Sequence, residues 1–273
     1  MSPSLSPQGE EKIMQDNLHV SIIQSSLYWE NIDKNLKQFS QKISQLTKPA
    51  DVIILPEMFT TGFSMNTVAL AESMDGKGVA WMRQKTKEKN CCVVGSLIIK
   101  ENNNYYNRLV WAYPDGSLVH YDKRHLFRMA NEQQHYSPGN KKIIVEYKGW
   151  KICPLVCYDL RFPVWSRNVK NEYDLLIYIA NWPERRSHAW KSLLVARAIE
   201  NFSYVAGVNR VGKDGNDVSY SGDSIVINYK GEPFNTAKVN EENAETISIS
   251  HKELTEFRNS FPAFMDADIF RIS

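Results

Sequence analysis

The chain has 273 residues, of which 42% are apolar and 23% are charged, a composition typical of a globular protein. Because 33 basic residues nearly balance 31 acidic ones, leaving a net charge of +2, the charge gives no reason to expect nucleic acid as a partner. No run approaches the roughly 18 apolar residues of a membrane span, so no membrane partner is expected.

The first 18 residues predict a flexible N-terminal extension. They contain Ser, Pro, Gln, Gly and several charges, and they lack the apolar core of a signal peptide. Without an export signal we expect a cytoplasmic protein whose four cysteines are reduced thiols. Whether Met14 is an alternative start is left open.

Strands and helices alternate in the first half of the chain. Apolar runs predict strands, and amphipathic runs at helical spacing predict helices. In chain order we expect a strand at 19–24, a helix at 31–48, a strand at 51–57, a helix at 77–89, and strands at 91–100, 105–114 and 117–123. The dipeptide Asp115-Gly116 predicts a hairpin turn between the last two strands.

The second half begins with a long connection, 124–139, of the kind that is often functional. After it we expect a hairpin at 142–157, a short helix near Pro163, a strand at 174–182, a helix at 187–202 with Ser187 as N-cap, strands at 203–212, 223–229 and 245–251, and a final helix at 252–261. No repeat or linker divides residues 19–273, which predict a single α/β domain. The mixture of hairpins and crossovers favours two packed mixed sheets with helices outside.

Three reactive side chains each follow an apolar strand: Glu57, Lys123 and Cys157. Binding and chemistry gather at such strand ends. A thiol is mostly protonated at neutral pH, so a neighbouring carboxylate can take its proton, and an ammonium can stabilise the oxyanion that forms on attack. Together the three predict a base, a cation and a nucleophile.

Other interpretations of these residues remain open at this point. His125 or His135 could serve as the base of a Cys–His pair instead of Glu57. Cys157 could be a core thiol, as we expect for Cys153. The Cys153-x-x-x-Cys157 spacing lacks a second cysteine pair or a nearby histidine pair, so no metal site is expected there.

The segments ILPEMFTTGF, YDKRHLF and CYDLRFP resemble, in order, the three signature motifs of the nitrilase (carbon–nitrogen hydrolase) superfamily. The resemblance extends from about His19 to Phe257 and implies a four-layer α-β-β-α sandwich. It also implies that Glu57, Lys123 and Cys157 are catalytic, that no cofactor is needed, and that the protein is a homodimer. The segment NEQQHYSPG places Glu132 where the family has a second glutamate that orients the substrate and the lysine.

Three longer segments, KRHLFRMANEQQHYSPG, CYDLRFPVWSRN and IANWPERRSHAW, resemble bacterial omega-amidases, which hydrolyse the terminal amide of 2-oxo acids such as 2-oxoglutaramate and 2-oxosuccinamate. The implied substrate is a small anionic amide. The alternatives are another amidase of the superfamily, such as an N-carbamoyl amino acid amidase, a Cys–His hydrolase, or a non-enzymatic binding protein on this fold.

The same interpretation assigns supporting roles to other residues. The backbone N–H of Tyr158 would help Lys123 to hold the oxyanion. A substrate carboxylate favours arginine, and the candidates are Arg128, Arg185 and Arg186. We expect Phe127 and Trp182 to supply apolar walls and Arg161 to form a structural ion pair.

Overall fold

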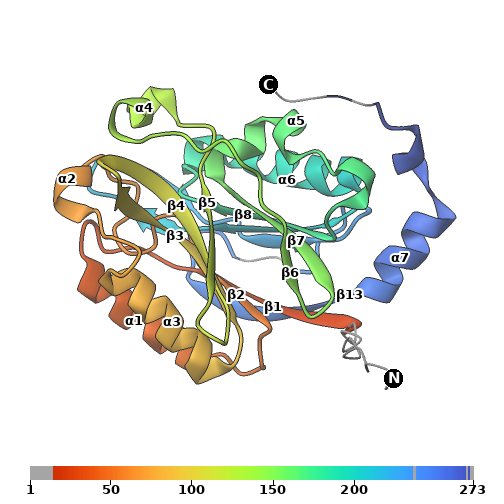
Figure 1. Ribbon diagram of the computed structural model, residues 1–273, viewed down its shortest axis with the longest axis horizontal. Coiled ribbons are helices and arrows are strands. Elements are labelled where there is room, and N and C mark those ends of the chain that lie inside the picture. Colours follow the sequence, from red (N-terminus) through yellow and green to blue (C-terminus); the bar gives the residue numbers. More distant parts are fainter. Residues whose placement is uncertain (1–14, 236–237, 269, 271–273) are drawn as a thin grey trace, which may run out of the picture.

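The computed structural model describes residues 15–235, 238–268 and 270, and it contains two β-sheets packed face to face (Figure 1). Residues 1–14 of the predicted extension lie outside the described residues. Asn17 and Leu18, which were expected to belong to the extension, are the first residues of strand β1. Among the described helices, none combines the length and the apolar character that crossing a membrane requires.

The first sheet has six strands in the order β13-β1-β2-β3-β4-β5. Strands β1, β2 and β3 are parallel to one another, and the remaining pairs are antiparallel, so the sheet is mixed. Its strands are β1 (Asn17–Gln24), β2 (Val52–Ile54), β3 (Cys92–Glu101), β4 (Asn104–Ala112), β5 (Leu118–Asp122) and β13 (Asn243–Ser250).

The second sheet has five strands in the order β12-β9-β8-β7-β6 and is also mixed, with β7, β8 and β9 parallel. Its strands are β6 (Val145–Tyr147), β7 (Trp150–Val156), β8 (Leu175–Ala180), β9 (Tyr204–Asn209) and β12 (Ile225–Ile227). A separate two-stranded ribbon joins β10 (Val211–Lys213) to β11 (Ser219–Ser221).

Helices cover the outer face of each sheet, as Figure 1 shows. Helices α1 (Ile32–Ser44) and α3 (Lys77–Lys89) lie against the first sheet, and α5 (Pro163–Ser166) and α6 (Ser187–Asn201) lie against the second. The shorter helices α2 (Thr67–Leu70) and α4 (Glu132–His135) belong to connections, and α7 (His251–Ser260) follows β13. The predicted architecture of two mixed sheets with helices outside is therefore confirmed.

Strand alternation separates two apolar cores. Val52, Ile54 and Cys92 contribute to the core between the sheets, whereas Ile53 and Cys91 contribute to the core under α1 and α3. Successive side chains of a strand point to opposite faces, which is why the adjacent cysteines lie in different cores. All four cysteines are buried free thiols, and Cys153 lies in the apolar core as expected.

Several predicted elements differ in their bounds. Strand β2 ends at Ile54, three residues before Glu57, so this glutamate stands in the loop after the strand and not at its last position. The expected strand at 203–212 is interrupted at Arg210, and the ribbon β10–β11 was not expected.

The prediction for Ser187 was wrong. It is the first residue of α6, where Arg186 takes the N-cap position, and its hydroxyl donates to the carboxylate of Asp223 at 2.7 Å. A strong acceptor nearby thus binds the hydroxyl that would otherwise have capped the helix.

Candidate active site

Cys157 stands where β7 ends and the 3₁₀ helix η2 (Cys157–Arg161) begins. Its φ of 44° lies in the left-handed region, which costs a residue other than glycine about 1–3 kcal/mol. Such strain persists only where the surroundings fix it, and it is concentrated at functional sites. The turn presents Cys157 to a cavity of about 550 Å³.

Lys123 lines this cavity and lies between two carboxylates. Its Nζ is 2.9 Å from Oε1 of Glu57 and 3.0 Å from both carboxylate oxygens of Glu132. None of these three side chains is exposed to solvent. Buried charges require such pairing because an isolated ion would lose its hydration without compensation.

The carboxylate of Glu57 is held at both oxygens. Nδ2 of Asn107 donates to Oε1 at 2.7 Å, and the backbone N–H of Asn181 donates to Oε2 at 2.8 Å. The side chain of Asn181 also donates to the backbone oxygen of Glu57 at 2.6 Å. The Glu57 carboxylate is thereby fixed in one orientation before any substrate binds.

Glu132 is fixed in a similar way. Its Oε2 accepts the backbone N–H of Phe127 at 2.5 Å, and its Oε1 accepts a longer bond of 3.3 Å from Asn107. Asn107 therefore bridges Glu57 and Glu132 by donating to the same Oε1 atoms that accept from Lys123. Because both carboxylates are held in this way, the hydrogen bonds that they accept fix the position of the Lys123 ammonium.

Burial raises the pKa of the Cys157 thiol well above its ordinary value, and the charge of Glu57 raises it further, whereas the ammonium of Lys123 lowers it. The thiol is therefore protonated at neutral pH in the resting site. Burial lowers the pKa of Lys123, but the charges of Glu132 and Glu57 outweigh this effect and keep it raised, so the ammonium is charged. Burial also raises the pKa of Glu132, against the opposing effect of Lys123.

Three arginines line the cavity near Cys157: Arg161, Arg185 and Arg186. None of them forms a salt bridge with the described residues. The guanidinium of Arg186 lies 5.1 Å from the ring of Phe127, and that of Arg161 lies 5.1 Å from the ring of Trp182. Burial and the neighbouring charge of Arg185 lower the pKa of Arg186. This wall offers guanidinium groups to an anion.

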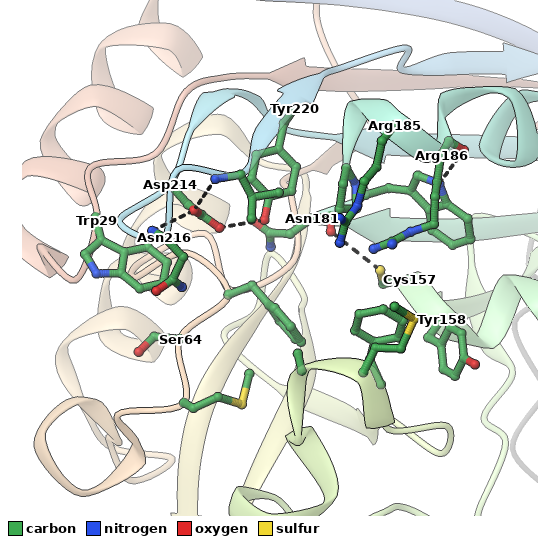
Figure 2. Close-up of a pocket in the computed structure, with 18 of the residues that line it drawn as sticks. Trp29, Ser64, Cys157, Tyr158, Asn181, Arg185, Arg186, Asp214, Asn216 and Tyr220 are labelled. Atoms are coloured by element: carbon green, nitrogen blue, oxygen red, sulfur yellow. Dashed lines mark hydrogen bonds between the residues drawn. The ribbon is translucent and has the colours of Figure 1, made fainter.

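The opposite side of the cavity is acidic. Figure 2 shows Trp29, Asp214 and Asn216 away from Cys157, with Arg185 and Arg186 on its side. Glu30 also lines the cavity, and Asp214 accepts hydrogen bonds from within the loop between β10 and β11. A bound anion is therefore attracted to the arginine side and repelled from the other.

The structure sorts the remaining predicted residues. Phe127, Tyr158 and Trp182 line the cavity, and Tyr158 is the second residue of η2. Arg128, the first residue of the 3₁₀ turn Arg128–Ala130, is exposed and does not line the cavity. Arg161 has no acidic partner among the described residues, so the structural ion pair expected for it is absent.

The two histidines considered as alternative bases do not line the cavity. The ring of His125 stacks on Phe162 with centroids 3.8 Å apart, and its Nδ1 lies 2.7 Å from Oδ1 of Asp159. His135 is exposed at the end of α4. The geometry therefore favours Glu57 over a histidine as partner of Cys157.

Asp159 is a structural link that sequence reasoning missed. Its fully buried carboxylate accepts hydrogen bonds from the N–H of Val156, the hydroxyl of Tyr121, and the N–H and ring of His125. It thereby joins the turn of Cys157 to the segment around Lys123. The sequence signal that could have indicated Asp159 is its place in the motif CYDLRFP, two residues after Cys157.

Asn107, Asn181 and the loop between β10 and β11 were also missed. An asparagine just before the apolar run LVWA of its strand indicates Asn107, and an asparagine directly after the buried run IYIA indicates Asn181. The dipeptide Asp214-Gly215 indicates the turn of the missed ribbon. Among the described residues, no group of three or more His, Cys, Asp or Glu side chains is arranged to hold a metal ion.

A scan against family models matches residues 19–259 to the carbon–nitrogen hydrolase family. The chain belongs to this family, and it is a hydrolase that acts on carbon–nitrogen bonds of non-peptide amides. The resemblance inferred from the three motifs is therefore confirmed.

Within the family the chain is similar to Omega-amidase YafV of Escherichia coli strain K12, with 48% identity over 255 residues, covering 93% of this chain and 98% of the relative. It is also 33% identical to the 2-oxoglutaramate amidase of Bacillus subtilis strain 168, covering 90% and 96% of the two chains. The crystal structure of XC1258 from Xanthomonas campestris, a CN-hydrolase superfamily protein with an arsenic adduct in its active site, superposes with a TM-score of 0.92 at 44% identity. That match covers 95% of this chain and all of the other.

Proposed function

We propose that this protein is an omega-amidase that hydrolyses the terminal amide of small 2-oxo dicarboxylic acid monoamides, such as 2-oxoglutaramate and 2-oxosuccinamate, to the acid and ammonia. The observation that carries the proposal is the placement of three arginines without acidic partners beside Cys157 in one cavity. The names of the relatives, an omega-amidase and a 2-oxoglutaramate amidase, support the same substrate class.

In the first half of the reaction, Glu57 takes the proton of the Cys157 thiol as the sulfur attacks the amide carbon. A buried thiol with a raised pKa needs such a base, and a carboxylate that is held in place can act as one. The oxyanion forms against the ammonium of Lys123 and the backbone N–H of Tyr158. The carbon–nitrogen bond then breaks, and Glu57 returns its proton to the leaving nitrogen, which departs as ammonia.

The second half of the reaction hydrolyses the resulting thioester. A water molecule gives its proton to Glu57 and its oxygen attacks the thioester carbon, and the carbon–sulfur bond breaks. The proton then passes to the Cys157 sulfur, which regenerates the thiol and the carboxylate. Lys123 stays charged throughout because Glu57 and Glu132 raise its pKa, so its role is electrostatic. No step requires a metal or an organic cofactor.

The arginine wall selects the substrate. A 2-oxo acid presents a carboxylate next to a carbonyl, and a guanidinium can bind a carboxylate with two parallel hydrogen bonds. Arg185 and Arg186 are on the Cys157 side of the cavity (Figure 2), and the acidic side disfavours the reverse orientation of the substrate. The carboxylate is thus bound while the amide end reaches Cys157.

The test is ammonia release from 2-oxoglutaramate, glutamine, an N-carbamoyl amino acid and a simple nitrile, compared at equal concentrations. We expect kcat/KM for 2-oxoglutaramate to exceed the others by at least about a hundredfold. Faster turnover of the N-carbamoyl amino acid would assign the chain to the rival amidase class. No turnover of any of the four would contradict the proposed activity.

We also propose a homodimer, which the resemblance of the sequence to its family supports, and a cytoplasmic location. Light scattering at several concentrations tests the first proposal, because a dimer keeps twice the monomer mass of 31.5 kDa on dilution. Fractionation of the native cells tests the second.

A further inference from the structure

Asn181 has a buried acceptor that nothing in the described structure uses. Its Oδ1 accepts no hydrogen bond from the described residues, although the side chain is only 4% exposed. A buried polar atom without a partner costs about 1–3 kcal/mol, so each one that persists calls for an explanation.

The orientation of the side-chain amide is fixed by its neighbour. Nδ2 of Asn181 donates to the backbone oxygen of Glu57 at 2.6 Å. Only the NH₂ group of a side-chain amide can donate a hydrogen bond to such an oxygen. The flipped amide would place two acceptors against each other. Oδ1 is therefore the free atom, and it is an acceptor.

Asn181 also stands where the reaction takes place. It directly follows β8, it lines the cavity, and its backbone N–H donates to the Glu57 carboxylate at 2.8 Å. Its backbone oxygen lies 4.0 Å from the sulfur of Cys157. One residue thus contacts both the proposed base and the proposed nucleophile.

The leaving nitrogen of the substrate must come to the same place, because Cys157 attacks the carbon bonded to it and Glu57 protonates it. A primary amide nitrogen carries two N–H donors. Resting on the proposed function, we propose that Oδ1 of Asn181 accepts one of these N–H groups. Asn181 is then a specificity-determining residue that recognises the primary amide at its leaving group.

The proposal predicts which substrates Asn181 distinguishes. An ester of the same acid has an alkoxy oxygen in place of the amide nitrogen, and this oxygen has no hydrogen to donate. The hydrogen bond from the substrate to Asn181 therefore promotes attack on the amide, whereas the ester cannot form this bond. A site built to hydrogen-bond a particular substrate group discriminates strongly against an analogue that lacks the group.

The experiment compares kcat/KM of the 2-oxoglutaric acid 5-amide with that of its 5-methyl ester, since kcat/KM reports the attack that forms the thioester. In Asn181→Ala we expect the amide-to-ester ratio to fall by about tenfold or more from the wild-type value. Asn216→Ala is the matched control, because Asn216 is an exposed amide side chain that lines the far side of the same cavity. Its ratio is expected to stay at the wild-type value.

If Asn181 acts only structurally, through its bonds to Glu57, the substitution would lower kcat/KM equally for the amide and the ester. An unchanged amide-to-ester ratio would therefore overturn the proposal. If Asn181→Ala does not fold, Asn181→Ser is measured, because its shorter side chain also lacks an acceptor at the position of Oδ1. The amide-to-ester ratio of kcat/KM is again expected to fall by about tenfold or more, and an unchanged ratio overturns the proposal. Wild-type enzyme without activity on the amide would instead refute the proposed function itself.

Discussion

The ammonium of Lys123 lies 2.9 Å from a carboxylate oxygen of Glu57, and both side chains are completely buried. Glu57 comes from the loop after β2, and Lys123 directly follows β5. Residues 66 positions apart therefore meet beyond the carboxyl ends of two strands of the first sheet. The lysine remains charged because Glu132 and Glu57 raise its pKa, and in the proposed mechanism the carboxylate of Glu57 accepts the proton of the Cys157 thiol.

Replacing the nucleophile is expected to abolish turnover. Cys157→Ala removes the sulfur that forms the thioester, so kcat should fall by at least about a thousandfold. Ammonia release measures this directly, and the circular dichroism spectrum checks that the variant is folded. Residual turnover above about one per cent of wild type would contradict a covalent mechanism.

Glu57→Gln is expected to ease ionisation of the Cys157 thiol but to slow hydrolysis of the amide. It removes a negative charge that raises the pKa of Cys157, so the thiolate forms at lower pH and alkylation by iodoacetamide shifts to lower pH. It also removes the base, so amide turnover falls by about a thousandfold or more. Lys123→Met is the matched variant, because loss of the ammonium raises the pKa of the thiol and shifts alkylation to higher pH. Shifts in the same direction in both variants would show that these charges do not govern the thiol.

Arg186→Ala is expected to raise KM for 2-oxoglutaramate by about tenfold or more, because a guanidinium bound to a carboxylate is lost. KM for an uncharged amide such as butyramide should change by less than about threefold. Arg128→Ala provides the control, since Arg128 is exposed outside the cavity and should leave both values unchanged. Equal effects of Arg186→Ala on both substrates would argue against binding of the carboxylate at this position.

Asp159→Asn is expected to lower kcat more than it raises KM. The carboxylate accepts four hydrogen bonds from Val156, Tyr121 and His125, and an amide would place a donor among these donors. Cys157 and Lys123 then shift relative to each other, which is expected to reduce kcat by about tenfold to a hundredfold. Stopped-flow and steady-state kinetics measure kcat and KM separately. A change confined to thermal stability would show that Asp159 has no positioning role.

Glu242 is expected to stabilise the fold only above acidic pH. Hydrogen bonds and the charge of Lys42, together with Ser26, outweigh burial and lower the pKa of Glu242 from 4.5 to about 2. Because the pKa is lower in the folded state, the stabilisation is complete above about pH 4.5 and is lost as the pH falls towards 2. Glu242→Gln should therefore lower Tm at neutral pH, and the difference from wild type should shrink on acidification. A difference that is independent of pH would contradict this assignment.

The sequence was sufficient for the elements whose pattern is local. Helix α3 has the expected bounds, and the turn at Asp115-Gly116 joins β4 to β5 as expected, since glycine readily adopts the positive φ of 85° found at Gly116. The three motifs placed Glu57, Lys123 and Cys157, which the fold brings to one cavity wall or directly behind it.

The remaining features depend on contacts between distant segments. Arg128 and Arg186 were equal candidates in sequence, and only the path of the loop shows that one lines the cavity and the other does not. Asn181 joins Glu57 across 124 positions, and Asp159 joins Tyr121 across 38. Local patterns carry no information on such pairs, because each residue would be acceptable in a solvent-exposed loop.

The proposed reaction centre is divided between the two sheets. Glu57 and Lys123 follow strands of one sheet, whereas Cys157 and Asn181 follow strands of the other. A small sliding of one sheet over the other would separate the base from the sulfur while every strand keeps its own hydrogen bonds. Catalysis is therefore expected to disappear at lower denaturant concentration or hydrostatic pressure than the secondary structure, so turnover would report on sheet packing before unfolding begins.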